Sequence, residues 1–209
     1  MKIPLRYQMT EYDCGPTSLL NGLNYLFERE EIPPEIVRNI MLYCLDTYGP
    51  DGHSGKSGTS QAAMTFLSGW LDCFGKTGHL NITSQYLRGR CVQFGPGSKL
   101  RSALRRGGVA VVRLFLECWH YVLLTGLEDD WVSCFDPYWD YDTYPPEEIQ
   151  VIHGHEMEYN RKIATRVFER ETLTDYAFGP IETREAVLMF NTQTVLPEEE
   201  AVEISDYVI

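Results

Sequence analysis

The sequence predicts an α+β fold, with helices in the first part of the chain and an antiparallel sheet in the second. Up to about residue 75, apolar residues recur at the three- and four-residue spacing of helices. From residue 81 onward, the apolar runs are short and rich in β-branched residues, which favours strands. At 209 residues, the chain is long enough for one sizeable core. We therefore expect a single domain over residues 1–196, followed by an acidic tail over residues 197–209.

The first predicted helix begins at Cys14, where Asp13 can serve as the N-cap and Pro16 is tolerated in the first turn. Gly22 lowers the helix propensity of this segment, which suggests a close packing contact. A second helix is predicted over residues 33–46, because two prolines precede a stripe of apolar residues at helical spacing.

Two further helices are predicted from capping signals. Thr59 or Ser60 can cap a helix that ends near residue 75, and Ser98 can open a short helix that two glycines end at 107–108. Between these helices, residues 81–94 are predicted to form two short strands.

The remaining strands are predicted in the second half of the chain. Residues 109–116 form a β-branched run that is typical of a central strand. Residues 120–127 and 131–135 are predicted to pair as a hairpin around the acidic loop 128–130. A late strand is expected over 186–190, whereas the charged segment 145–170 shows only weak helical periodicity.

Charge and composition exclude several classes of function. The 30 acidic and 18 basic side chains give a formal charge of −12, and nucleic-acid binding requires basic patches, so we expect no nucleic-acid partner. Arg113 and Glu117 interrupt the longest apolar stretch, so no segment is expected to span a membrane. The six cysteines have no paired spacing and the N-terminus lacks a signal peptide, which favours a cytoplasmic location.

Cys14 is the candidate nucleophile. Most free cysteines are inert packing residues, but a helix N-terminus carries partial positive charge and unpaired N–H groups that favour the reactive thiolate. Gln8, six residues earlier, can donate its side-chain amide to an oxyanion hole together with the Cys14 backbone N–H. The other cysteines fall within helix or strand patterns and are interpreted as structural: Cys44, Cys73, Cys91, Cys118 and Cys134.

His120 and Asp136 are the candidate general base and the carboxylate that orients it. If the hairpin loop has three residues, Val122 pairs with Asp136, and the two candidates share one face of the sheet within reach. A two-residue loop would move Asp136 to the opposite face, so the site requires an odd-length loop or a bulge. An aspartate before a proline is also common in turns, and Asp140 and Asp142 are weaker substitutes.

A metal site is also considered, at the pair His153 and His155. No cysteine pair or nearby carboxylate cluster completes a tetrahedral site there. We therefore expect neither a metal nor a cofactor.

The stretch QMTEYDCGPTS, followed by a leucine-rich helix, resembles the start of papain-like cysteine peptidases of the bacteriocin-processing group, which cleave double-glycine leader peptides. Three later stretches agree in order and spacing: GTSQAAMTFL, LRSALRRGGVAVVRL leading into WHYVLLTGLEDDWVSCFDPY, and EAVLMF. The resemblance covers residues 1–145 well. It implies a papain-like fold whose nucleophile lies at a helix N-terminus packed on an antiparallel sheet. It also implies the roles of four residues: Cys14 as nucleophile, His120 as base, Asp136 as orienting residue and Gln8 in the oxyanion hole.

The expected activity is hydrolysis of a peptide bond, or of a small amide, through an acyl-thioester on Cys14. Because no transporter follows and no inhibitory pro-segment precedes the motif, we expect a stand-alone member with narrow specificity. An acyltransferase on the same fold shares the first half-reaction and differs only in the nucleophile that reaches the thioester. A non-catalytic domain that binds leader peptides is a third interpretation, against which the retained Cys14 and His120 argue. The oligomeric state is not predicted.

Overall fold

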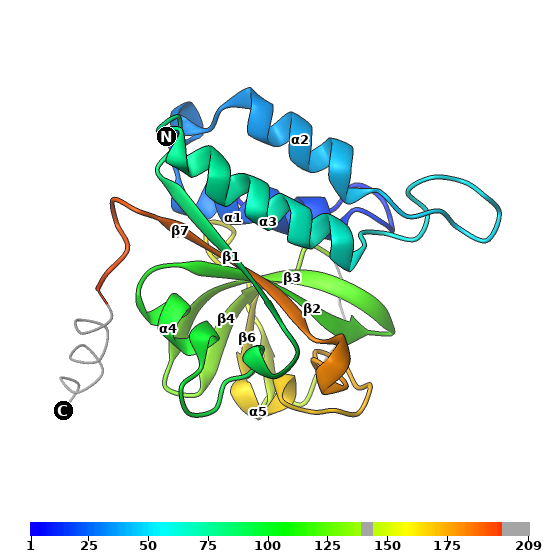
Figure 1. The fold of residues 1–209 in the computed structure, drawn as a ribbon. Helices are drawn as coiled ribbons and strands as arrows, with labels where there is room; N and C mark the ends of the chain where they lie inside the picture. The colour runs from blue at the N-terminus through cyan, green and yellow to red at the C-terminus, as the bar shows by residue number, and fades with distance from the viewer. Residues whose placement is uncertain (139–143, 198–209) are drawn as a thin grey trace.

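The structure, a computed structural model, describes residues 1–138 and 144–197 (Figure 1). It contains a seven-stranded sheet in the order β1-β7-β2-β3-β4-β6-β5, in which every pair of neighbours is antiparallel. The strands are β1 (Ile82–Arg88), β2 (Val109–Leu116), β3 (Cys118–Glu128), β4 (Trp131–Phe135), β5 (Ile149–Val151), β6 (Arg161–Ala164) and β7 (Glu185–Asn191). The helices are α1 (Cys14–Leu26), α2 (Pro34–Cys44), α3 (Gln61–Lys76), α4 (Lys99–Arg105) and α5 (Thr165–Phe168). The predicted α+β class is confirmed.

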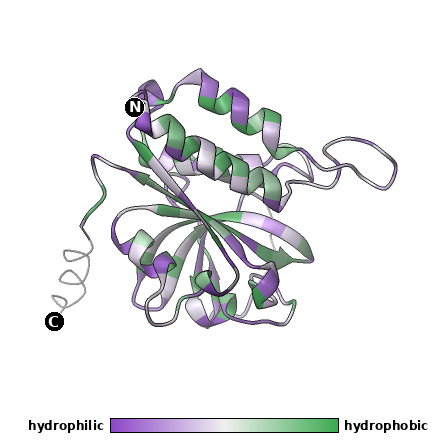
Figure 2. Ribbon diagram, in the orientation of Figure 1, coloured by the Kyte–Doolittle hydropathy of each residue, from purple (hydrophilic) through white to green (hydrophobic). Residues whose placement is uncertain are grey.

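Helices cover both faces of the sheet, in two layers. The helices α1, α2 and α3 pack on one face, and the short helices α4 and α5 lie on the other (Figure 1). The central strand β2 is buried on both faces, because its side chains alternate: Val109 and Val111 face the first layer, whereas Ala110 and Val112 face the second. On α2, hydrophobic and hydrophilic bands alternate in Figure 2, as expected for a helix with one face buried.

Gly22 allows α1 to lie close against the sheet. A Cβ atom at this position would be 2.3 Å from Cε of Met189 on β7 and 3.3 Å from Cδ1 of Leu123 on β3. The close packing contact predicted for Gly22 is therefore confirmed, and it brings the nucleophile's helix onto the two strands.

The predicted caps of the later helices are confirmed. Ser60 accepts the N–H of Ala63 at 3.1 Å, and Ser98 accepts the N–H of Arg101 at 3.0 Å. The prediction of two strands over 81–94 is wrong, because β1 ends at Arg88 and a 3₁₀ turn follows over Gly89–Cys91. The segment 145–170, which the sequence did not resolve, supplies the edge strand β5, its neighbour β6 and the helix α5.

Some predictions fall on residues outside the described ranges. These are the substitutes Asp140 and Asp142 and nearly all of the predicted tail, 198–209. No helix within residues 1–138 and 144–197 combines the length and the apolar character that a membrane span requires.

Candidate active site

Cys14 is the first residue of α1 and is 7% exposed. The loop before it is held by the carboxylate of Asp13, which accepts the backbone N–H of Met9 at 3.0 Å and of Thr10 at 2.6 Å. Burial raises the pKa of Asp13, but the hydrogen bonds from the Thr10 hydroxyl and from these N–H groups outweigh burial and lower it. Asp13 thus occupies the predicted N-cap position, yet its carboxylate fixes the preceding loop instead of capping α1.

The segment before this loop is tied both to α1 and to the residues after β4. Asn21 of α1 accepts the N–H of Arg6 and donates to its carbonyl oxygen, both at 2.8 Å. Two residues later, the N–H of Gln8 donates to the carbonyl oxygen of Pro137 at 2.8 Å. The backbone of Gln8 is therefore held next to the segment that carries Asp136.

One of the two N–H groups of the Gln8 side-chain amide is not used in a hydrogen bond within the described residues. Its Nε2 donates to the carbonyl oxygen of Thr10 at 2.7 Å, and its Oε1 is buried with no hydrogen-bond partner within the described part of the chain. Because an amide nitrogen carries two hydrogens, a second N–H remains for an oxyanion. The role of Gln8 in an oxyanion hole stays a prediction.

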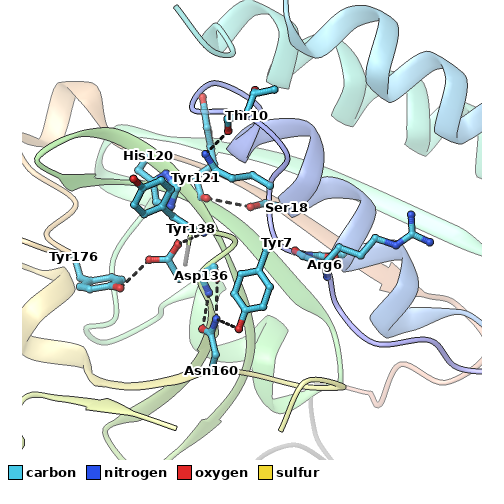
Figure 3. A network of polar contacts seen from close by, with 12 residues as sticks. Arg6, Tyr7, Thr10, Ser18, His120, Tyr121, Asp136, Tyr138, Asn160 and Tyr176 are labelled. Carbon is cyan, nitrogen blue, oxygen red and sulfur yellow. Dashed lines mark hydrogen bonds and ion pairs between the residues drawn. The ribbon is translucent and has the colours of Figure 1, made fainter. Parts of the chain in front are cut away.

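Ser18 connects the helix of the nucleophile to the strand of the base. Its hydroxyl lies one turn after Cys14 and donates to the carbonyl oxygen of Tyr121 at 3.0 Å, in a buried position (Figure 3). Tyr121 follows His120 on β3, so this hydrogen bond fixes α1 against the part of β3 that carries the base.

The register of the β3–β4 hairpin places Asp136 on the same face as His120. The turn has two residues, since Glu128 pairs with Trp131, and the predicted three-residue loop is therefore wrong. A bulge between Leu124 and Gly126 then shifts the register back by one residue, so that Leu123 pairs with Phe135. Continuing this register places Asp136 opposite Val122, which is the arrangement that the site requires.

Thr125 is the extra residue of that bulge. It is 4% exposed, and its hydroxyl donates to the carbonyl oxygen of Glu158 at 2.9 Å. Thr125 has no pairing partner in the ladder with β4. This hydrogen bond ties the bulge to the segment between β5 and β6.

His120 and Asp136 form a buried pair. The Nε2 atom of His120 lies 2.8 Å from Oδ1 of Asp136, and the residues are 5% and 0% exposed. Because Nε2 is engaged, Nδ1 is the ring nitrogen left to interact with the Cys14 side chain. Burial alone would lower the pKa of His120, but Asp136 and Cys14 together raise it to about 10. His120 is thus an imidazolium at neutral pH, and its positive charge lies beside the Cys14 side chain.

Two further groups hold the Asp136 carboxylate. The hydroxyl of Tyr176 donates to Oδ2 at 2.7 Å and the N–H of Tyr138 donates to Oδ1 at 2.9 Å (Figure 3). Burial opposes ionisation of Asp136, but the charge of His120 and these hydrogen bonds lower its pKa. The carboxylate is therefore ionised in spite of its complete burial.

Asn160 fixes the backbone of Asp136. Its side chain accepts the Asp136 N–H and donates to the Asp136 carbonyl oxygen, both at 2.8 Å, and its Nδ2 also lies 3.4 Å from the hydroxyl of Tyr7 (Figure 3). Neither Asn160 nor Tyr176 was predicted as part of the site. Tyr176 has a positive φ of 62°, which is uncommon for a residue other than glycine, but nothing in its local sequence marks it.

The other five cysteines lack the environment of Cys14. Cys44 and Cys134 are buried, and burial raises the pKa of both thiols. Cys73, Cys91 and Cys118 are exposed, so packing does not account for them. Of the six, Cys14 is the thiol that the structure brings to a histidine and a carboxylate.

The histidine pair considered for a metal does not gather further ligands. The ring of His155 stacks on Tyr159 at a centroid distance of 4.8 Å. Within the described ranges, no group of three or more histidine, cysteine, aspartate or glutamate side chains is arranged to hold a metal ion.

Comparison with solved structures finds a likeness to a protease. The fold is similar to a double glycine motif protease from an AMS/PCAT transporter, solved in complex with its leader peptide, with a TM-score of 0.41 and 14% sequence identity over 90% of each chain. No known protein family matches the sequence, and no curated protein matches it. Membership of the bacteriocin-processing group stays a prediction, and residue roles are assigned from the geometry of the site itself.

Proposed function

We propose that this chain is a cysteine peptidase that cleaves a peptide bond through an acyl-thioester on Cys14. The proposal is carried by the position of His120, whose ring interacts with the Cys14 side chain and lies 2.8 Å from the Asp136 carboxylate. A thiol, an imidazole and a buried carboxylate in this order can activate a nucleophile and then protonate a leaving group.

In the first half-reaction, the Cys14 thiolate adds to the carbonyl carbon of the scissile bond, and the carbonyl oxygen becomes an oxyanion. We assign the Cys14 backbone N–H and the second amide N–H of Gln8 as the donors to that oxyanion. His120 then gives its proton to the departing amine, and the C–N bond breaks to leave the acyl-thioester.

In the second half-reaction, neutral His120 takes a proton from a water molecule while the water oxygen adds to the thioester carbonyl. The C–S bond breaks, so the peptide leaves as a carboxylic acid and Cys14 is again a thiolate beside an imidazolium. Asp136 takes no proton in either step, and instead orients the ring and stabilises its charge.

Burial of the reacting groups supports narrow specificity. Cys14 is 7% exposed and His120 is 5% exposed, so a substrate must present its scissile bond on a slender, extended segment. A peptide fits this requirement better than a bond within a folded protein domain.

The test is cleavage of a proteome-derived peptide library, with new termini identified by mass spectrometry. We expect the wild type to cut a restricted set of sites, the Cys14→Ala and His120→Ala variants to cut none, and the exposed-thiol variant Cys73→Ala to match the wild type. Cleavage retained in Cys14→Ala would refute the proposal. An added amine separates hydrolysis from acyl transfer, because an amine-capped product forms only when the amine competes with water for the thioester.

A further inference from the structure

The second layer of the fold contains a cavity that the proposed reaction does not use. It has a volume of about 1010 Å³ and lies between α4, the loop before it and the strands β1 and β7. Cys14, His120, Asp136 and Gln8 do not line it, and α4 lies on the sheet face opposite to α1 (Figure 1). We call it the α4 groove; the residues that the argument uses are Pro96, Lys99, Arg101, Arg105, Arg106 and Phe190.

The α4 groove is basic in a strongly acidic chain. Although the formal charge is −12, residues 73–116 contain eight lysines and arginines and no acidic residue. Four of these basic residues line the groove: Lys99, Arg101, Arg105 and Arg106. Such a concentration of one sign of charge favours an anionic occupant.

Two of the four cations form no ion pair among residues 1–138 and 144–197, although the charge of one of them, Arg105, also acts on Asp130. Arg101 forms an ion pair with Asp130, with Nη2 2.7 Å from Oδ1. The side chain of Arg106 is hydrogen-bonded to the backbone of Leu196. Lys99 and Arg105 are exposed and form no ion pair within those described ranges. They are therefore available to an acidic segment.

The described chain ends beside this groove. The N–H of Leu196 donates to the carbonyl oxygen of Arg106 at 2.9 Å, and Nε of Arg106 donates to the carbonyl oxygen of Leu196 at 2.6 Å. The next residues, 198–209, contain five acidic residues, no basic one and several apolar ones. Twelve residues span up to about 40 Å when extended, which is ample to cross a groove that starts one residue away.

From this juxtaposition we propose that the α4 groove is a docking site for the chain's own acidic segment, residues 198–209. Glutamates at 198, 199 and 200 pair with Lys99 and Arg105, and apolar residues of the segment pack on Pro96 and Phe190. The charge of the groove selects the segment, and the two hydrogen bonds between Arg106 and Leu196 deliver it there.

The test is hydrogen exchange of the full chain, read by mass spectrometry on peptides that cover 198–209. In the wild type, we expect these peptides to exchange more slowly than the intrinsic rate. In Lys99→Glu/Arg105→Glu, exchange should accelerate about tenfold or more. Each of the two attractions favours the docked segment by a factor of about two to five, and in the variant both become repulsions. The control Arg29→Glu/Arg38→Glu makes the same charge change on exposed residues of the helical layer, and should leave the exchange unchanged.

A charge swap separates docking from damage to the fold. Adding Glu198→Lys, Glu199→Lys and Glu200→Lys to the groove variant should restore slow exchange, while peptides from β2 and β3 report that the sheet is intact. Exchange at the intrinsic rate in the wild type, or no response to Lys99→Glu/Arg105→Glu, would overturn the proposal. Slow exchange that disappears on dilution would overturn it as well, because the occupant would then be the segment of a second copy.

Discussion

Replacing Asp136 by asparagine should flatten the pH dependence of folding stability between pH 6.5 and 10. In the wild type, burial lowers the pKa of His120 but Asp136 and Cys14 raise it, from an ordinary value of 6.5 to about 10. The folded protein therefore binds this proton more tightly than the unfolded chain does. Such stabilisation is fully present below pH 6.5 and is lost as the pH rises through about 10.

The magnitude follows from the same change in pKa. A rise from 6.5 to about 10 corresponds to about 5 kcal/mol of unfolding free energy. In a chain of this size, each kcal/mol shifts the melting temperature by about 2–4 °C, so the effect approaches about 10–20 °C. Because Asp136 is the largest of the groups that raise the pKa, most of this pH dependence should disappear in Asp136→Asn.

The assay is urea unfolding followed by tryptophan fluorescence at several pH values. The quantity to compare is the difference in unfolding free energy between the wild type and Asp136→Asn, in which the titration of buried thiols such as Cys44 cancels. We expect this difference to shrink as the pH rises from 6.5 to 10. Tyr176→Phe is the matched control, because it removes a hydrogen bond to Asp136 and keeps the carboxylate. A difference that stays constant across this pH range would refute the reasoning.

Three further predictions concern the nucleophile, the helix packing and the bulge. His120→Ala should slow iodoacetamide labelling of Cys14 at pH 6 by at least about tenfold, with exposed Cys73 as the internal reference for mass spectrometry; an unchanged ratio of the two rates would contradict it. Gly22→Ala should cost about 1–3 kcal/mol in urea unfolding, because its Cβ would lie 2.3 Å from Met189 Cε, and this cost should be smaller when Gly22→Ala is made in a Met189→Ala background. Deleting Thr125 should leave the labelling of Cys14 as fast as in the wild type, because removing the extra residue keeps Leu124 paired with Cys134 and Asp136 on the face of His120; labelling as slow as in His120→Ala would rule this out.

Local signals in the sequence account for the elements that were predicted well. Ser60 and Ser98 cap α3 and α4 through hydrogen bonds to residues three positions later, so the information lies within one turn of helix. The prediction of two strands over 81–94 failed because a distant contact decides that region. Gly89, with a φ of 58°, donates its N–H to the carbonyl oxygen of Arg184, and β1 ends there.

The residues of the candidate site likewise divide into those that a local sequence pattern indicates and those that depend on distant contacts. Cys14, His120 and Asp136 each lie in a segment with a distinctive local pattern, and the structure brings all three together. Tyr176 and Asn160 lie 40 and 24 residues from Asp136, and their roles depend on contacts that only the folded chain creates. No periodicity or capping rule can identify such partners.

The β3–β4 hairpin shows how a functional requirement can decide between two strand registers. A two-residue turn is favoured locally, since Asp129 adopts the left-handed conformation, with a φ of 52°, that tight hairpins need. That turn alone would point Asp136 away from His120. The bulge at Thr125 reverses the shift, and the hydrogen bond from its hydroxyl to Glu158 offsets the disrupted ladder. The hairpin thus keeps its favoured turn and, by accommodating the extra residue at Thr125, still presents Asp136 to His120.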